Sequence, residues 1–389
     1  MIPLVLVCAA LAGGAYILFG YPLLLALWKG RPAKPVRKDL NFHPSVTVIV
    51  AVRNGEAFLH RKLESLLAQD YPRQQVEILV VSDGSTDRTE AIAESFADRS
   101  VRLLRQPWGG KATAINTALA EARGEVLFFT DVRQPLNHSA LSHLVANLAD
   151  PTIGVVSGEL RLLKPGRGEQ ADLDLYWRYE IWVRNRHTRL GSILGATGCI
   201  YVVRRSLVSP IPADTLSDDV LIPVRAFLLG YRVVFEPEAQ ATDAPAVAGV
   251  EFLRRWRTLS GLWQVFVREP RLLVGSGPMT IHFLSHKLGR LLLPWILLVL
   301  LAATPGLPSG WFRTSLLALD ATFILLALLD TVMPRWTRLK RLTSPARTFV
   351  VMNAASLAAA AVFFVSPQRL WRPTQVDDPP PPADTANAG

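Results

Sequence analysis

Residues 2–28 (IPLVLVCAALAGGAYILFGYPLLLALW) form an apolar run that contains no charged side chain. A helix that spans a bilayer needs about 20 such residues. A secretory signal peptide is the competing interpretation. It is disfavoured because the basic residues follow the run, and because the run is longer than the apolar core of a signal peptide. We therefore expect a membrane-spanning helix at the N-terminus.

Three further apolar runs, residues 288–304, 312–333 and 346–365, lie near the C-terminus, and apolar residues make up 50% of the whole chain. Basic residues follow the first run and separate the third from the fourth. They are Lys29, Arg31, Lys34, Arg37 and Lys38 in the first group, and Arg335, Arg338, Lys340, Arg341 and Arg347 in the second. The positive-inside rule places both groups in the cytosol. With four spans, both termini face outward and residues 29–287 are cytosolic.

The net charge of +10 suits nucleic acid, anionic lipid or a phosphorylated ligand. The basic residues cluster beside the apolar runs and no nucleic-acid-binding motif is present, so we expect membrane lipids and no nucleic acid as partners. The two cysteines, Cys8 and Cys199, have no metal-ligand spacing and suggest neither a disulfide framework nor a zinc site.

The middle of the chain alternates between strand and helix patterns. Strands are predicted at 46–52, 76–83, 101–105 and 125–131, and helices at 56–69, 87–97 and 110–123. This order predicts an α/β fold with a doubly wound sheet, in which ligands bind beyond the carboxyl ends of the strands. Neither a G-x-G-x-x-G after the first strand nor a P-loop is present, which disfavours dinucleotide cofactors and P-loop hydrolysis.

Three polar residues follow or flank these elements at the predicted ligand edge. Asp83 ends the second strand and could accept hydrogen bonds from a base or ribose; the alternative is an ordinary strand-to-helix turn with an Asp N-cap, which is common. Lys111 follows two glycines at a helix start, where it suits a phosphate or a nucleobase oxygen, or is simply solvated. Asp131 follows the apolar strand EVLFFT, and its carboxylate together with diphosphate oxygens suits Mg²⁺ or Mn²⁺.

Six ordered blocks carry a resemblance to a known family. They are VIVAVRNGEAFL, VVSDGSTDRT, GGKATAIN, FFTDVRQ, GATGCIYVVRR and SDDVLIPVRAFLLGYRVVFEPEA. Together they resemble the family 2 inverting glycosyltransferases of GT-A fold, whose membrane-embedded relatives include cellulose, hyaluronan and chitin synthases. The resemblance covers about residues 45–265. It implies a mixed doubly wound sheet joined to transmembrane helices, and transfer of a sugar from a nucleotide-sugar.

The resemblance also implies roles for single residues. Glu56, Asp83 and Lys111 match positions that hold the nucleoside, and Asp131 matches the first acid of the DxD metal motif. Arg53 lies at the same strand edge and is grouped with the donor-binding residues.

Asp219 matches the general base of the family, and Asp218 takes the acidic place before it. A carboxylate beside the acceptor hydroxyl can take its proton during a single displacement, which inverts the anomeric centre. The alternative is that both acids cap the helix that begins near Val220.

The acceptor is expected to meet two segments. Residues 195–205 match a segment that lines the acceptor site, so Gly195, Thr197 and Gly198 are predicted to bind acceptor. Residues 251–267 occupy the place of a QxxRW motif, with Arg254, Arg255 and Arg257 as expected diphosphate contacts and Trp256 as a surface for a sugar ring. An amphipathic helix on the membrane surface explains the same pattern.

Two departures from the family pattern leave alternatives open. Asp131 is followed by Val132 and Arg133 instead of a second acid, so Arg133 could contact a phosphate in place of part of the metal's charge. The strict QxxRW is absent, which makes a processive synthase the second choice after transfer to a lipid-linked or polysaccharide acceptor. A non-catalytic scaffold of the same fold is the third. UDP is the default donor nucleotide because it is the commonest among the relatives.

The predicted organisation has six parts: 1–28, an N-terminal transmembrane helix; 29–44, a basic linker; 45–250, the GT-A domain; 251–287, amphipathic interface helices; 288–365, three transmembrane helices; and 366–389, a disordered Pro-rich tail. The expected setting is the bacterial inner membrane, in envelope or exopolysaccharide biosynthesis, with a cytosolic catalytic domain. An oligomer or an export partner could supply helices for a channel.

Overall fold

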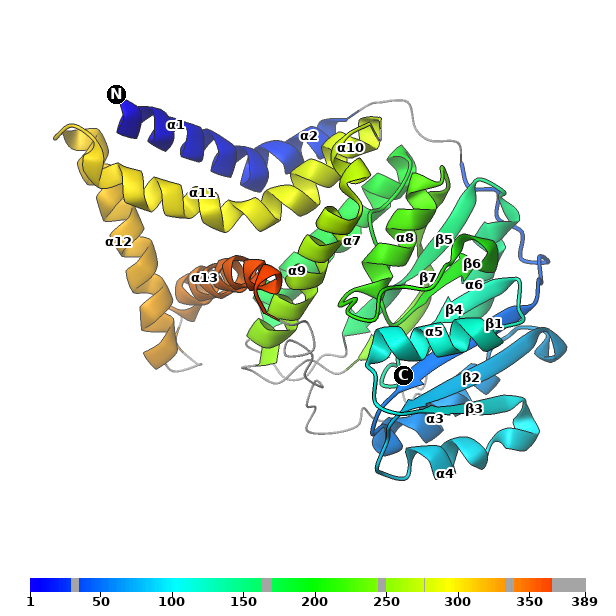
Figure 1. Ribbon diagram of the computed structural model, residues 1–389. Coiled ribbons are helices and arrows are strands. Elements are labelled where there is room, and N and C mark those ends of the chain that lie inside the picture. Colours follow the sequence, from blue (N-terminus) through cyan, green and yellow to red (C-terminus); the bar gives the residue numbers. More distant parts are fainter. Residues whose placement is uncertain are drawn as a thin grey trace. The chain divides into compact units, whose positions relative to one another are not determined.

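The computed structural model describes residues 1–28, 35–162, 170–243, 250–275, 277–333, 337 and 339–365. The described chain divides into two compact units (Figure 1). The sheet unit contains the β-sheet with the helices between its strands, and the helical unit contains the two terminal apolar regions and most of one helix from the middle of the chain. The predicted tail, 366–389, and the basic residues Lys29, Arg31, Lys34, Arg335 and Arg338 lie outside the described residues.

The sheet unit is built on one mixed sheet. Its strands are β1 (Val46–Val52), β2 (Val76–Asp83), β3 (Val101–Gln106), β4 (Val126–Phe129), β5 (Ile153–Leu162), β6 (Tyr201–Arg204) and β7 (Arg232–Asp243). They lie in the order β3-β2-β1-β4-β6-β5-β7. β6 runs antiparallel to β4 and β5, and the other pairings are parallel. The predicted doubly wound mixed sheet is confirmed.

Apolar runs form the central strands because neither face of a parallel sheet is left open to water. In β1, every residue except Ala51 is buried, and β2 is buried except at Glu77. The helices of this unit are α3 (Glu56–Leu67), α4 (Thr89–Glu94), α5 (Lys111–Glu121), α6 (Ala140–Ala146) and α8 (Asp218–Leu228). α5 packs against β1 and β2, while α8 packs against β5 and β7.

The strand order reverses at β1, which has β2 on one side and β4 on the other. At such a switch point the following connections leave in opposite directions and open a crevice beyond the carboxyl ends of the strands. The chain after β1, β2 and β4 carries Arg53, Asp83 and Asp131 to this edge. The fold therefore brings together the ends of strands that are far apart in sequence.

The helical unit contains α1 (Ile2–Ala15), α2 (Tyr21–Leu27), most of α7 (Gln170–Leu190), α9 (Val250–Arg268), α10 (Pro278–Phe283), α11 (Gly289–Ala303), α12 (Trp311–Val332) and α13 (Lys340–Ala359). Short π-helical segments, Tyr16–Gly20 and Leu284–Leu288, join α1 to α2 and α10 to α11. Four continuous helical stretches are long and apolar enough to cross a membrane: Ile2–Leu27, Met279–Gly306, Trp311–Val332 and Lys340–Phe363. Each overlaps one predicted span, and the second begins nine residues earlier than predicted.

Polar contacts join the elements of the helical unit. Glu180 of α7 is buried and pairs with Arg290 of α11, and His286 lies 3.4 Å from the same carboxylate. Asp330, buried near the end of α12, accepts from Thr343 of α13 at 2.7 Å and pairs with Lys340 at 3.0 Å. These two carboxylates therefore join α7 to α11 and α12 to α13.

Candidate active site

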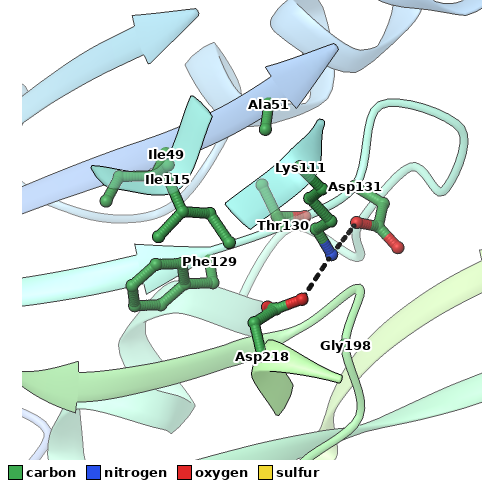
Figure 2. A pocket seen from close by; sticks show the side chains of 9 residues that line it. All are labelled: Ile49, Ala51, Lys111, Ile115, Phe129, Thr130, Asp131, Gly198 and Asp218. Atoms are coloured by element: carbon green, nitrogen blue, oxygen red, sulfur yellow. Dashed lines mark hydrogen bonds and ion pairs between the residues drawn. The ribbon is translucent and has the colours of Figure 1, made fainter. Parts of the chain in front are cut away.

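A pocket opens at the carboxyl ends of β1 and β4 in the sheet unit (Figure 2). Its floor is apolar and its rim carries two carboxylates and one ammonium group. The lining residues are Ile49, Ala51, Lys111, Ile115, Phe129, Thr130, Asp131, Gly198 and Asp218. The pocket therefore lies at the strand edge where the sequence predicts a ligand.

Lys111 bridges the two acids of this pocket. Its Nζ lies 2.9 Å from Oδ1 of Asp131 and 3.2 Å from Oδ1 of Asp218 (Figure 2). Gly110, with φ +89°, turns the chain so that Lys111 is the first residue of α5. Burial alone would lower the pKa of Lys111, but Asp131, Asp218 and Asp219 together raise it above its ordinary value. The side chain is therefore a permanent cation in this pocket.

Asp218 is held from two sides. It is the first residue of α8 and is 6% exposed. Besides Lys111, it accepts a hydrogen bond from the Tyr201 hydroxyl at 3.1 Å. Burial and the neighbouring Asp218 raise the pKa of Tyr201 well above its ordinary value, so the phenol remains a donor. Tyr201 in turn stacks on Phe129, with ring centroids 4.8 Å apart.

Asp219 faces the turn that contains the predicted acceptor-binding residues. Its carbonyl accepts from the amide of Ala196 at 2.7 Å. A Cβ added to Gly198 would lie 2.9 Å from Oδ2 of Asp219, and one added to Gly195 would lie 3.2 Å from Cγ2 of Val220. Small residues at these positions thus make room for the start of α8.

Thr197 is the anchor of the same turn. It is 9% exposed, and its amide donates to Oγ of Ser157 on β5 at 2.8 Å. The two hydroxyl groups of this pair are 3.2 Å apart. Thr197 is thus held by the sheet, and its neighbour Gly198 lines the pocket.

Asp83 organises the loop between β3 and α5. It is 3% exposed, and its carboxylate accepts from Gln106 Nε2 at 2.7 Å, from Gly109 N at 2.8 Å and from Gly110 N at 2.9 Å. Backbone amides that point at a carboxylate hold a loop firmly. In this structure Asp83 thus fixes the turn that delivers Lys111.

Arg53 and Trp108 form an exposed pair beside Asp83. The Arg53 guanidinium lies 5.1 Å from the centre of the Trp108 ring, which is 57% exposed. Gly84, with φ +63°, permits this approach, because a Cβ there would lie 2.8 Å from the amide nitrogen of Trp108. Glu56 begins α3 and accepts from the amide of Arg88 at 2.9 Å. Arg53, Trp108 and Glu56 thus lie on loops or helix ends near the end of β2, which carries Asp83.

Arg133 does not point at Lys111 or Asp218. Its guanidinium donates to Oδ2 of Asp243 at 2.5 Å, and Gln134 Nε2 donates to the same oxygen at 2.8 Å. Asp243 is 1% exposed at the end of β7. The charge that replaces the second acid of the metal motif is thus neutralised by a buried carboxylate.

Lys62 of α3 is a site component that sequence reasoning missed. It is 1% exposed, and its Nζ donates to Thr130 Oγ1 and to the carbonyl of Gln134, both at 2.6 Å. Burial lowers the pKa of Lys62 to about 7. We call residues 130–134 the Asp131 loop. Lys62 therefore contacts both ends of this loop.

One sequence feature could have revealed Lys62. Leu59, Leu63 and Leu66 form the apolar stripe of α3, and Lys62 lies on the same face, one turn from Leu59 and from Leu66. Lysine on such a stripe is almost never fully buried unless it has polar partners. Asp243 had no comparable feature, because its partners lie 109 and 110 positions away in sequence.

The remaining predicted residues lie on α9 in the helical unit. Arg254, Arg255 and Arg257 are half-buried there. Trp256 donates its indole N–H to the carbonyl of Ala358 at 2.8 Å, which packs α9 against α13. The structure thus gives Trp256 a packing contact within the helical unit.

The described residues contain no group of three or more His, Cys, Asp or Glu side chains suited to a metal. Asp131 is nevertheless accessible, with its side chain 39% exposed. Mg²⁺ is commonly held by one or two carboxylates together with substrate phosphates and water. One carboxylate at the pocket rim fits a divalent cation that arrives with a diphosphate.

Residues 47–211 match the family described as "Glycosyl transferase family 2". Among curated proteins, the chain is 26% identical over 218 residues to the "Probable glycosyltransferase YdaM" of Bacillus subtilis, covering 52% of this chain and 51% of that protein. It is 27% identical over 231 residues to a "Beta-monoglucosyldiacylglycerol synthase" of Synechocystis, covering 55% and 47%. The chain thus spans about half the length of these curated relatives.

A solved structure gives a longer match. The mannosyltransferase PcManGT of Pyrobaculum calidifontis, in complex with GDP-Man and Mn²⁺, is 29% identical with a TM-score of 0.70. The match covers 92% of this chain and 98% of that one. The family match and the likeness to PcManGT, together with the sheet order, thus indicate a glycosyltransferase domain of GT-A fold. The chain carries a domain of glycosyl transferase family 2.

Proposed function

We propose that this protein transfers a sugar from a nucleoside-diphosphate sugar to a lipid-linked or polysaccharide acceptor, with inversion at the anomeric carbon. The observation that carries this proposal is the line of charges in the pocket. Lys111 lies 2.9 Å from Asp131 and 3.2 Å from Asp218 at the edge of the sheet where GT-A domains bind donors.

The donor diphosphate is proposed to lie against Lys111 and Asp131. The ammonium of Lys111 attracts the phosphate oxygens and remains charged at any physiological pH, because its pKa is raised. Mg²⁺ or Mn²⁺, held by Asp131 and the diphosphate, would supply further positive charge against the leaving group. Asp83 supports this geometry by holding Gly109 and Gly110, which precede Lys111.

Asp219 is proposed as the general base. The acceptor hydroxyl gives its proton to this carboxylate while its oxygen bonds to the anomeric carbon. The bond from that carbon to the diphosphate oxygen breaks, and the diphosphate keeps the electron pair. Asp218 is less suited to this role, because its carboxylate is buried and its two oxygens already contact Lys111 and Tyr201. It would instead orient Lys111.

Two donor classes and two acceptor classes fit this proposal. GDP-mannose is the donor present in the PcManGT complex, so GDP-sugars belong beside UDP-sugars in any test. Relatives are named as synthases of a glucosyl diacylglycerol and of poly-beta-1,6-N-acetyl-D-glucosamine, which supports lipid and polysaccharide acceptors alike. The four apolar helices favour an acceptor presented at a membrane. We propose the bacterial inner membrane, with the sheet unit in the cytosol.

The deciding experiment is a donor panel. The full chain, purified in detergent, is incubated with UDP- and GDP-sugars in the presence of Mg²⁺, Mn²⁺ or EDTA, and release of the nucleoside diphosphate is measured. We expect release with one donor class and a loss on the order of 100-fold or more in Asp219→Asn. Asp98→Asn, an exposed change outside the pocket, is the matched control.

The length of the product separates the two enzymatic alternatives. A single added sugar supports a simple transferase, and a ladder of products supports a processive synthase. If no donor is consumed under any metal condition while the protein is folded, the catalytic proposal is wrong and the scaffold interpretation gains support.

A further inference from the structure

The buried amino group of Lys62 has no role in the proposed chemistry. It is enclosed by α3 and the end of β4, with 1% of the residue exposed. Burial of a cation costs several kcal/mol unless hydrogen bonds compensate. Both partners of Lys62 belong to the Asp131 loop: Thr130 Oγ1 and the carbonyl of Gln134, each at 2.6 Å.

These two contacts lie on either side of Asp131 in the sequence. Thr130 precedes Asp131 directly, and Gln134 follows it by three residues. Thr130 is 4% exposed and Gln134 is 5% exposed, whereas the Asp131 side chain is 39% exposed. One buried group thus fixes both ends of a short loop whose middle faces the pocket.

The contact continues beyond the loop. Thr130 Oγ1, which accepts from Lys62, donates to the carbonyl of Cys199 at 2.7 Å. Cys199 follows Gly198, which lines the pocket beside Asp219. The chain of bonds from Lys62 through Thr130 to Cys199 therefore links the donor side of the pocket to the turn on its other side.

A second anchor holds the loop from β7. Arg133 and Gln134 both donate to Oδ2 of Asp243, at 2.5 and 2.8 Å. A DxD motif could be fixed in part by the cation that its two acids share. This loop offers only Asp131, so the protein itself has to set the direction of that carboxylate.

We propose that Lys62 is a positioning residue for Asp131, acting through the Asp131 loop and the turn at Cys199. The proposal rests on the proposed function, because it assigns Lys62 to the donor side of that reaction. Lys62 touches neither donor nor acceptor in this role. It holds the loop so that the carboxylate meets the diphosphate and its cation in one orientation.

The test compares Lys62→Met with the wild-type full chain in detergent. Methionine is close in volume to lysine. It removes both the buried amino group, whose burial is unfavourable, and the hydrogen bonds to Thr130 and Gln134, whose loss is unfavourable, so we expect only a small change in melting temperature. Backbone hydrogen exchange should become faster in peptides that cover residues 130–134 and remain unchanged in peptides from β1. Transfer should fall 10- to 100-fold, and the Mn²⁺ concentration for half-maximal activity should rise about tenfold.

Two further variants sharpen the comparison. Thr130→Val removes the hydroxyl that joins Lys62 to Cys199 while keeping the shape, and the double variant should be no worse than the more impaired single variant, because both remove one network. Lys38→Met is the control: its ammonium pairs with Glu236, away from the pocket. It should leave exchange in the Asp131 loop and the Mn²⁺ requirement unchanged.

Each outcome decides the proposal. Unchanged exchange in the loop overturns it, as does faster exchange with an unchanged rate and Mn²⁺ requirement. A fall in melting temperature with a proportional loss of active protein indicates a role in folding alone and also overturns it. If the wild type consumes no donor, the proposed function fails by itself, and exchange in the loop still decides whether Lys62 fixes it.

Discussion

At the scale of single residues, Gly198 is the most sensitive neighbour of the proposed base. Gly198→Ala would place a Cβ 2.9 Å from Oδ2 of Asp219, so the carboxylate has to move. A displacement of about 1 Å at a reacting group can cost about 100-fold in rate. We expect kcat to fall by about that factor with little change in melting temperature, measured by diphosphate release and thermal unfolding.

Gly310→Ala is the control for this change. A Cβ there meets nothing within 4 Å, and the backbone is extended with φ 164°. Its kcat should equal that of the wild type. An unchanged kcat in Gly198→Ala would argue against Asp219 as the base.

Cys199 is predicted to be chemically inert in the folded protein. Burial, with a smaller contribution from the charge of Asp131, raises the pKa of its thiol to about 12. Because the pKa is raised, the thiolate is scarce at pH 8 and increases only as the pH approaches 12. In a Cys8→Ser background, iodoacetamide at pH 8 should modify Cys199 only after unfolding, as followed by mass spectrometry. Rapid alkylation of the native protein would contradict the buried position.

At the scale of elements, α7 depends on one buried carboxylate. Glu180 pairs with Arg290 of α11, so Glu180→Gln leaves a half-buried arginine without this counter-charge. Removing one partner of a fully buried pair costs about 3–5 kcal/mol, and the partial exposure of Arg290 makes the expected loss smaller than that. We expect a clear fall in the melting temperature of the full chain in detergent, measured by tryptophan fluorescence.

The matched control is Glu94→Gln, because Glu94 pairs with Arg105 on the surface, where its side chain is 58% exposed. Solvent screens an exposed pair, so that variant should melt like the wild type. Adding Arg290→Met to Glu180→Gln should recover part of the loss. Equal melting temperatures for Glu180→Gln and the wild type would show that the pair does not stabilise α7.

Some of the helices and strands could be predicted from the sequence, and others could not. The apolar runs at 46–52 and 76–83 predict β1 and β2 with their bounds, because a buried parallel strand is apolar almost throughout. The helix over 170–190 was not predicted: its charged and aromatic residues show no clear stripe of helical period. Its contacts are with helices that follow it by about a hundred residues, and such pairings are not visible in a local pattern.

Some residues of the candidate site could be predicted from local sequence, and others could not. Asp83, Lys111 and Asp131 follow strands or glycines, so their approach to one edge follows from the parallel order of the strands. Lys62 and Asp243 reach the site from the apolar face of α3 and from the end of β7, and only the folded chain brings them to the Asp131 loop. The partner of Arg133 could not be predicted from the sequence either. It pairs with Asp243, and only the folded position of β7 brings that carboxylate close to Arg133.

At the scale of the whole molecule, the proposed orientation predicts which positions face the cell exterior. Ser309, exposed between α11 and α12, should lie outside, and Asp98, exposed in the sheet unit, should lie in the cytosol. In a Cys8→Ser background, a membrane-impermeant maleimide should label Ser309→Cys in intact cells and Asp98→Cys only after lysis. The reverse pattern would invert the topology and separate the sheet unit from cytosolic nucleotide-sugars.

The contacts of Lys111 with Asp131 and Asp218 also affect the proposed release of the product diphosphate. One ammonium contacts the carboxylates of both Asp131 and Asp218. A donor must therefore compete with carboxylates of the protein for that cation, which lowers the net gain from binding. After transfer, Asp131 and Asp218 can again pair with Lys111. The two carboxylates therefore compete with the product diphosphate for this cation. Under the proposed function, this competition should weaken donor binding and favour release of the product diphosphate.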